Sequence, residues 1–515
     1  MNIKKRLKLA VKLTFENLKS GIQKHPDRSL QIPWNFAQVG VLIFPVIPIL
    51  GALGIFLGLI GTYKQKNSEI LRCKINRAFA ILGVLLVITA VFANNPIEAF
   101  LGLGNFLPFF IFFATFSRLI QTPAQLRQLS WMIVISSIPV IFLGFGQQFL
   151  GWSGIVQLQP VLGWVLEPTG NPPGRMASVF MYANILACYL TIVFILALGL
   201  WEEGSSATDC VTDLTDRRQK PEDGRRNIET INEFPIPKAQ LPRPNYQFLF
   251  LSFAVVGNAV ALIFTNSRNA WGLAVLAVLA LAFYGGYKKF LAAVFSAVGA
   301  VFLSAFGPPP LRQYLRVIIP SFFWARLTDE MFPNRPTATL RTTQWQFAWS
   351  MTQQRPWTGW GLRNFTALYE AQMHEWLGHP HSLILMLTAE TGIPATLFFL
   401  GLVGWVLARG VLLLVNWRSH FPVDIEQEQI AAQATEENAI SNITNRVICQ
   451  DTNSGDRLIF FSYLLAFAAC TLFNTVDVTL FDFRVNTISW LLLAAICGVS
   501  EASVSLPRKE AQQGF

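Results

Sequence analysis

Three of the chain's five histidines, His374, His379 and His381, lie close together, and the last of them precedes an apolar run. Histidine is the side chain best suited to accept a proton near neutral pH. Arginines are frequent around this segment, and an arginine fork can bind diphosphate oxygens and neutralise charge on a leaving diphosphate. These residue types indicate transfer from a diphosphate with His381 as general base. A helix-capping position beside Ser382 is the structural alternative.

Two further arginines stand beside apolar runs. Arg175 lies at the mouth of the run 179–200, and Asn184 lies about two turns inside it. Arg268 lies in the short polar turn 265–271. An arginine in an outer turn opposes the usual charge bias of membrane proteins, which favours an anion contact for Arg268. For Arg175, phosphate binding and a reach to lipid headgroups are equally open, and Asn184 could simply join two helices.

The segment 307–380 is rich in arginine and poor in acidic residues. Arg341 is expected to open a helix that lies on the membrane surface, and Trp360 belongs to the turn Arg355-Pro-Trp-Thr-Gly-Trp-Gly361. Lipid anchoring is the alternative for the arginines, and a place in the membrane interface is the alternative for the tryptophan. The candidate substrate-binding residues are Arg175, Asn184, Arg355, Trp360 and Glu390.

The sequence predicts neither a metal centre nor a cofactor. His379 and His381 form the only tight pair of possible metal ligands, and Glu375 is the one obvious third. Zinc sites in proteins usually use more ligands than this. We therefore expect chemistry that relies on side chains alone.

The composition predicts an all-α polytopic membrane protein. Of 515 residues, 52% are hydrophobic and only 14% are charged, and soluble globular proteins rarely reach this balance. Apolar runs near the roughly 20 residues that a helix needs to cross the hydrocarbon core indicate about 10–12 transmembrane helices. The runs are Phe79–Phe92, Phe100–Phe116, Met132–Leu150, Val179–Leu200, Phe248–Phe264, Leu273–Tyr284, Phe290–Phe306, Ala395–Val415, Phe460–Phe473 and Ile488–Cys497.

Lysine and arginine mark the loops that we expect to face the cytoplasm. The N-terminus and the loop 64–77 both carry this signal, and one span cannot join two inside segments. The run Val39–Thr62, which contains Pro45 and Pro48, is therefore predicted to be a short hairpin. Both termini are predicted to be cytoplasmic, in a protein of the plasma (inner) membrane with one long periplasmic loop that carries short helices. The net charge of +10 follows from this topology and requires no nucleic acid.

The chain divides into alternating membrane and loop segments. Residues 1–35 form a basic amphipathic N-terminus, and the polar cytoplasmic loops 202–246 and 418–457 are expected to be disordered because they are poor in aromatic residues. Membrane helices are assigned to 36–201, 247–306, 382–417 and 458–501, the outer loop with the candidate site to 307–381, and the cytoplasmic tail to 502–515.

A series of motifs resembles the O-antigen ligase and polymerase superfamily. The motifs are Ser267-Arg-Asn-Ala-Trp271, Arg341 before Trp345, Arg355-Pro-Trp-Thr-Gly-Trp-Gly361 with Phe365, and His381-Ser with Ala389-Glu-Thr-Gly-Ile393. Their order is more specific than any single motif. Within the superfamily, the chain most resembles a cyanobacterial branch whose members often carry the name putative bicarbonate transporter.

The resemblance implies a metal-independent membrane glycosyltransferase of polysaccharide or lipopolysaccharide biosynthesis. A glycan would pass from an undecaprenyl-diphosphate-linked donor to an acceptor hydroxyl at the outer face of the inner membrane, within surrounding membrane lipids. The acceptor could be a lipid-linked sugar, a glycan or a protein. By resemblance, His381 is the general base, and Arg268 and Arg341, helped by Arg175, bind the donor diphosphate. Ser382 departs from the family's frequent asparagine, which leaves acceptor geometry open.

A carrier or accessory protein for inorganic carbon, such as bicarbonate, is the alternative from another class. A transporter is expected to place charged or polar ligands near the bilayer midplane, on broken helices. In this sequence, the arginines and His381 gather near one face of the membrane. This distribution favours the transferase. A scaffold that binds lipid headgroups is a third reading, but it gives the histidines no role.

Overall fold

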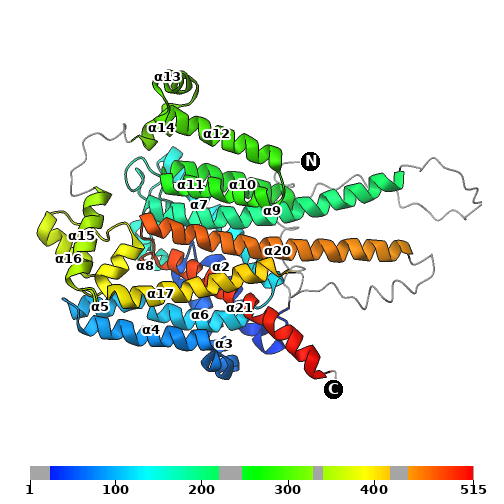
Figure 1. Cartoon of the computed structure of the whole chain (residues 1–515), viewed down its shortest axis with the longest axis horizontal. Coiled ribbons are helices and arrows are strands. Elements are labelled where there is room, and N and C mark those ends of the chain that lie inside the picture. Colours follow the sequence, from blue (N-terminus) through cyan, green and yellow to red (C-terminus); the bar gives the residue numbers. More distant parts are fainter. Residues whose placement is uncertain (1–23, 220–245, 329–339, 418–438, 514–515) are drawn as a thin grey trace, which may run out of the picture.

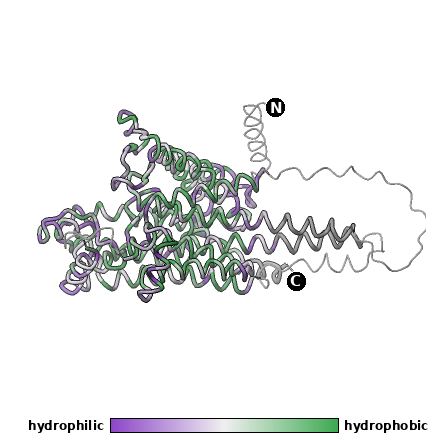
Figure 2. The backbone as a smooth tube through the Cα atoms, turned by 90° about the horizontal axis from the view of Figure 1, so that it is seen from above, coloured by the Kyte–Doolittle hydropathy of each residue, from purple (hydrophilic) through white to green (hydrophobic). Residues whose placement is uncertain are grey.

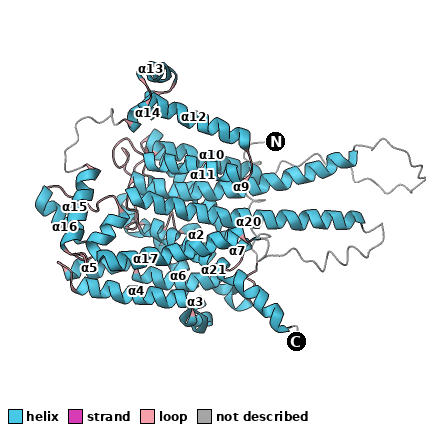
Figure 3. Cartoon of the chain, in the orientation of Figure 1, coloured by secondary structure: helices cyan, strands magenta, loops and turns pink. Residues whose placement is uncertain are grey.

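The computed structural model describes residues 24–219, 246–328, 340–417 and 439–513. These residues form helices and no strand, and most of the long helices run along one common axis (Figures 1 and 3). In this part of the chain, 9 helices are long and apolar enough to cross a membrane, and α11 (Arg268–Tyr284) is a shorter apolar helix. The predicted all-α polytopic architecture is confirmed.

Helix starts follow local sequence rules. Proline occupies the first turn of α3 (Pro48–Arg72), α5 (Pro96–Gly102), α6 (Leu107–Leu119), α7 (Pro123–Leu150), α8 (Gln159–Leu162) and α13 (Pro309–Ile318). Because the first turn needs no intrahelical N–H donor and proline fixes a helical φ, this position suits proline. The remaining α-helices of the described chain are α2 (Gln31–Ile43), α4 (Lys74–Val91), α9 (Ala183–Gln219), α10 (Tyr246–Phe264), α12 (Lys288–Phe306), α14 (Ser321–Leu327), α15 (Arg341–Gln354), α16 (Asn364–Met373), α17 (Leu383–Val415), α20 (Ala439–Val476) and α21 (Phe483–Gln513).

The predicted hairpin over Val39–Thr62 is present as α2 and α3. A short turn separates the end of α2 at Ile43 from the start of α3 at Pro48, and the two helices pack together. Glycine permits this close packing, because a Cβ at Gly40 would lie only 2.6 Å from the backbone nitrogen of Ile55. Small residues let helix backbones approach one another in membrane proteins.

Helices α9 and α20 pack side by side and define two ends of the bundle. We call the end that carries α15, α16 and residues 374–382 the histidine end (left in Figure 1). At the opposite end, which we call the far end, α9 and α20 project beyond the other helices. Hydrophobic residues dominate the bundle between the two ends (Figure 2).

Parts of the two loops expected to be disordered are helical instead. Helix α9 continues to Gln219, and the described part of α20 starts at Ala439, inside the predicted loop 418–457. The composition of these loops does not reveal an ion-pair network just beyond the apolar spans. In this network, Arg127 contacts both Glu203 and Asp456 and so joins α7, α9 and α20. The loop residues 220–245 and 418–438, and the predicted amphipathic N-terminus up to residue 23, lie outside the described residues.

Segments that were predicted to share a face of the membrane meet at a common end. At the far end, Asp27 pairs with Lys66 at 3.0 Å, and Arg118 pairs with Glu501 at 2.6 Å. At the histidine end, the backbone N–H of Asn94 donates to the carbonyl of Trp360 at 2.8 Å. The contacts therefore group the loops as the charge pattern predicts.

A break in α17 shapes the histidine end. Gly392 has φ 79° and ψ 165°, and Pro394 follows it, so the helix changes direction there. The backbone N–H of Ile393 donates to the carbonyl of Pro356 at 2.8 Å. A side chain at Gly392 would collide with the backbone of residue 357, so this contact requires glycine. The turn after α15 is thereby fixed against the start of α17.

Candidate active site

His381 lies immediately before α17 in an uncommon backbone conformation. Its φ is 50°, in the left-handed region, and its backbone N–H donates to Nδ1 of His379 at 3.2 Å. Ser382 is the N-cap residue of α17, but its side chain makes no capping hydrogen bond. The His381 side chain is 18% exposed, so it is packed in place and still reachable. Strained backbone held by its surroundings is common at functional sites.

Asp477, just beyond the end of α20, is the partner of His381. Its Oδ1 accepts a hydrogen bond from Nδ1 of His381 at 2.9 Å and another from the backbone N–H of Val478 at 2.8 Å. Its Oδ2 accepts from the side-chain amide of Asn184. The carboxylate is only 2% exposed. A buried carboxylate with this many donors holds a fixed position.

Asn184 extends this row of hydrogen bonds to Arg175. The Arg175 guanidinium donates to Oδ1 of Asn184, and its Nε donates to the carbonyl of Thr265 at 2.8 Å. The loop that carries Arg175 is held by Gln147, whose Oε1 accepts from the backbone N–H groups of residues 177 and 178. The structure thus brings together His381, Asn184 and Arg175, which the sequence analysis took from separate motifs.

The other two predicted catalytic arginines open helices at the same end. Arg341 is the first residue of α15, and its positive charge lowers the pKa of both His379 and Asp477. Arg268 is the first residue of α11, three positions after the Thr265 that binds Arg175. A helix N-terminus carries partial positive charge, which adds to the charge of an arginine placed there. This end of the bundle therefore favours an anion.

Burial and hydrogen bonding fix the charge states around His381. Burial raises the pKa of Asp477, but the hydrogen bond from His381 and nearby positive charge outweigh it and lower this pKa to about 2. Burial lowers the pKa of His379 to about 4, helped by His381 and Arg341. Near neutral pH, Asp477 is ionised and His379 is neutral. Since an ionised carboxylate only accepts, Nδ1 of His381 carries a proton, and in the neutral ring Nε2 then keeps a lone pair.

His379, His381 and Asp477 also form a possible set of metal ligands, because one ligand atom of each lies within 4.8 Å of the others. The hydrogen bonds argue against this use. Nδ1 of His381 is a donor to Asp477, and Nδ1 of His379 accepts a backbone N–H, which leaves its proton on the Nε2 that faces Asp477 at 3.9 Å. Both nitrogens nearest to Asp477 carry protons in this arrangement, so a metal would bind there only by displacing those protons and breaking the hydrogen bonds.

Arg355, Trp360 and Glu390 form a second cluster around the turn after α15. The Arg355 guanidinium lies 4.1 Å from the centre of the Trp360 ring, whose Nε1 donates to the carbonyl of Met351 at 2.9 Å. Glu390 is buried, and its Oε1 accepts from the backbone N–H of Phe365 at 3.2 Å. These contacts join α15, α16 and α17. No hydrogen bond or ion pair described here links this cluster to the row from His381 to Arg175.

Sequence reasoning missed Asp477. It follows the predicted apolar run Phe460–Phe473 by four residues, within the segment 458–501 that was assigned to membrane helices. A usable signal was present, because an acidic residue at the end of a span on the same face as a candidate base is a natural partner for that base. The spacing of 96 residues between His381 and Asp477 concealed the contact.

A comparison with protein families gives a match. The family model of O-antigen ligase matches residues 253–400, a segment that contains Arg268, Arg341 and His381 but not Arg175, Asn184 or Asp477. A search of curated proteins gives no match. The family match agrees with the resemblance predicted from the motifs: residues 253–400 of this multi-pass membrane protein are similar to the O-antigen ligase family.

Proposed function

We propose that the protein is a membrane glycosyltransferase of the O-antigen ligase type. It transfers a glycan from an undecaprenyl-diphosphate-linked donor to an acceptor hydroxyl. The observation that carries this proposal is the hydrogen-bonded row from Arg175 through Asn184 and Asp477 to His381. This row supports the proposal because it links His381, the proposed base, to Arg175 within one site. The O-antigen ligase match over residues 253–400 supports the donor and acceptor classes.

In the proposed reaction, His381 acts as the general base. Its Nε2 takes the proton of the acceptor hydroxyl as the oxygen attacks the anomeric carbon of the donor glycan. Asp477 accepts from Nδ1, so it orients the imidazole ring and stabilises the imidazolium that forms. Asp477 is a positioning residue, because it acts through His381. Positioned proton transfer of this kind contributes about 10²–10⁴-fold to a rate.

The arginines serve the other half of the reaction. The bond between the anomeric carbon and the diphosphate oxygen breaks, and its electron pair leaves with undecaprenyl diphosphate. Arg268 and Arg341, at the N-termini of α11 and α15, and Arg175 hold the diphosphate and offset the charge that develops on it. No step uses a metal ion. The reaction therefore needs only the acceptor, the donor and these side chains.

The proposal places the histidine end at the periplasmic face of the plasma membrane and both termini on the cytoplasmic side. Basic residues gather at the far end in the segments 64–77 and 118–127. Lysine and arginine favour the cytoplasmic side of bacterial membrane proteins. At the periplasmic face, the histidine end would also meet a lipid-linked glycan that has been exported across the membrane.

A transfer assay tests the proposal. Purified protein in lipid is given an undecaprenyl-diphosphate-linked glycan and candidate hydroxyl acceptors, and the release of undecaprenyl diphosphate is measured. We expect release by the wild type and its loss in His381→Ala and Arg268→Ala. His374→Asn and Arg312→Ala are matched controls, because these residues are exposed or partly exposed and stand outside the proposed site. We expect both controls to retain release.

The same preparation distinguishes the alternative of inorganic carbon transport. If the wild type releases no undecaprenyl diphosphate with native glycolipids and acceptors, but proteoliposomes take up bicarbonate, the transferase proposal is wrong. Equal release by the wild type and His381→Ala would also refute the role of the histidine.

A further inference from the structure

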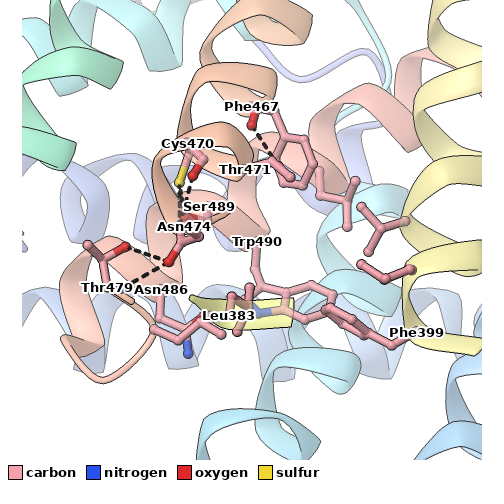
Figure 4. A pocket seen from close by; sticks show the side chains of 14 residues that line it. Leu383, Phe399, Phe467, Cys470, Thr471, Asn474, Thr479, Asn486, Ser489 and Trp490 are labelled. Carbon is pink, nitrogen blue, oxygen red and sulfur yellow. Dashed lines mark hydrogen bonds between the residues drawn. The ribbon is translucent and has the colours of Figure 1, made fainter. Parts of the chain in front are cut away.

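Polar side chains just after α20, in the pocket between α17, α20 and α21, are bonded to one another (Figure 4). The Thr479 hydroxyl donates to Oδ1 of Asn474 at 3.2 Å, and the backbone N–H of Thr479 donates to the same oxygen at 2.9 Å. The Asn474 amide donates to the carbonyl of Cys470 at 2.8 Å. Because these groups have partners in the wall itself, they offer little to a polar ligand.

Tyr182, just before α9, has a hydroxyl that bonds to none of the residues that the structure describes. Its side chain is partly buried. Two other tyrosines differ in this respect. The Tyr189 hydroxyl contacts the Ser136 hydroxyl at 3.2 Å, and the Tyr463 hydroxyl donates to the carbonyl of Leu126 at 2.9 Å. Because polar groups inside proteins usually have partners, the Tyr182 hydroxyl is available to a bound ligand.

Asn171 holds the backbone on both sides of Tyr182. Its side-chain amide donates to the carbonyl of Met181 at 2.8 Å, and its own carbonyl accepts from the backbone N–H of Ala183 at 2.8 Å. Met181 has φ 62°, in the left-handed region that most residues avoid. These bonds fix the backbone of Tyr182 against the loop that also carries Arg175.

Charges from both halves of the proposed site act on the Tyr182 phenol. Burial raises the pKa of this phenol, the charge of Asp477 raises it further, and the charges of Arg175 and Arg341 lower it. The resulting pKa lies above the usual value for tyrosine, so the phenol keeps its proton near neutral pH. Because electrostatic effects fall off with distance, the phenol lies near all three charged residues.

The neighbours of the phenol indicate an anion as its partner. Arg175 and Arg341 attract negative charge, and diphosphate oxygens only accept hydrogen bonds. A neutral phenol can donate to such an oxygen without losing its proton. The Asp477 carboxylate takes its hydrogen bonds from other donors, which include Asn184 and His381. The proton of the phenol is therefore left for a ligand.

We infer that Tyr182 is a further substrate-binding residue, whose hydroxyl donates a hydrogen bond to a diphosphate oxygen of the donor. This inference rests on the proposed transferase function. It adds a neutral donor to the arginines, from a position outside the segment 253–400 that matches the family model. No covalent bond forms or breaks at Tyr182, because the phenol shares its proton and keeps it.

Tyr182→Phe tests the inference, because it removes the hydroxyl and keeps the ring. Tyr189→Phe is the matched control, since it makes the same change at a buried position of α9 whose hydroxyl is bonded to Ser136. The measurements are the Kd of undecaprenyl diphosphate, KM for the donor, KM for the acceptor, and Tm. Undecaprenol, which has the same chain without the diphosphate, is the control ligand.

We expect Tyr182→Phe to raise the Kd of undecaprenyl diphosphate and KM for the donor by about tenfold, the order of one hydrogen bond to a charged group. Tm, KM for the acceptor and the binding of undecaprenol should match the wild type. Tyr189→Phe should lower Tm and leave the Kd unchanged. An unchanged Kd in Tyr182→Phe would overturn the inference. A rise in KM for the acceptor alone would assign the hydroxyl to the acceptor and would also overturn it.

A fluorinated tyrosine at position 182 gives a second readout. Fluorine lowers the pKa of a phenol, and a phenolate cannot donate a hydrogen bond and repels phosphate. We expect this variant to lose affinity for undecaprenyl diphosphate as the pH rises through the lowered pKa. The same replacement at position 189 should bind as the wild type does. If the variant at position 182 shows the pH dependence of the wild type, the phenol does not contact the diphosphate.

The binding measurements separate this inference from the proposed function. If the wild type transfers glycan but Tyr182→Phe binds undecaprenyl diphosphate with the wild-type Kd, the inference alone fails. If the wild type transfers nothing but binds undecaprenyl diphosphate more tightly than Tyr182→Phe does, the proposed function fails and the contact with the hydroxyl stands. If the wild type neither transfers nor binds, both fail.

Discussion

The two ends of the bundle use arginine in different ways. At the far end, Arg127 contacts Glu203 and Asp456 at 2.5 and 2.6 Å, and Arg118 contacts Glu501. The histidine end also has ion pairs, between Arg363 and Glu98 and between Arg484 and Asp482, but Arg175 of the proposed site donates to a neutral amide and a carbonyl. At the far end, matched charges join helices, whereas in the proposed site positive charge would serve to bind an anion.

His25 at the far end and His381 at the histidine end differ in how many of their ring nitrogens contact other groups of the protein. His25, at the far end, is 4% exposed, and its ring nitrogens contact the carbonyls of Asp27 and Leu119. His381 contacts one carboxylate through Nδ1 and keeps Nε2 for chemistry. A histidine with both nitrogens bonded to the protein is structural, and a histidine with one oriented nitrogen can act as a base. The comparison thus distinguishes a structural histidine from the proposed base.

The largest expected effect comes from replacing each of these two histidines with alanine. His381→Ala should lower the kcat of transfer by about 10²–10⁴-fold, the usual contribution of a general base, and leave thermal stability nearly unchanged. His25→Ala should lower stability by about 1–3 kcal/mol, because it leaves buried partners without hydrogen bonds, and should leave kcat unchanged. Initial rates and thermal unfolding in one detergent provide both measurements. A loss of kcat in His25→Ala would break the comparison.

An intermediate effect is expected from one arginine at each end. Arg127→Ala leaves Glu203 and Asp456 without their partner and should destabilise the protein by about 1.5–3 kcal/mol, as for hydrogen bonds to charged groups. Arg341→Ala should raise KM for the donor by about tenfold, in line with the loss of one charge-assisted hydrogen bond to phosphate. Arg341→Lys should restore part of the donor binding. If Arg341→Ala instead lowers stability and leaves KM intact, its role is structural.

The smallest expected effect concerns the pH profile. Asp477, with a pKa of about 2, stays ionised, and His379, with a pKa of about 4, stays neutral. Neither group changes charge between about pH 5 and 8, the range in which histidines usually titrate. We expect kcat/KM to fall with a one-proton slope toward low pH, because a protonated base cannot take a second proton. His379→Asn should keep this one-proton slope. A two-proton slope in the wild type would show that a second group titrates in this range.

The sequence predicted the fold better than the site. Long apolar runs and the placement of lysine and arginine were sufficient for the bundle, because a bilayer limits a chain to spans of about 20 residues. The same signals predicted the α2–α3 hairpin from two prolines and two basic flanks. Helix extension to Gln219 was missed, and so was the contact of Arg127 with Glu203 and Asp456, because these residues lie far apart in the chain.

Motif order indicated His381, Arg268 and Arg341, but it could not indicate which spans lie together. Asp477 is outside the segment that matches the family, and it meets His381 only because α20 ends beside the start of α17. Packing of helices in a membrane depends on side-chain fit over whole interfaces, which apolar periodicity does not encode. The contact between Asn184 and Asp477 was hidden for the same reason.

One measurement tests the central claim most directly: release of undecaprenyl diphosphate by the wild type, Asp477→Asn, His381→Ala and the double variant. If Asp477 acts through His381, Asp477→Asn should lose about 100-fold or more, and the double variant should be no slower than His381→Ala, since residues that act as a unit are not additive. Release by Asp477→Asn at the wild-type rate, or losses that multiply in the double variant, would contradict the account.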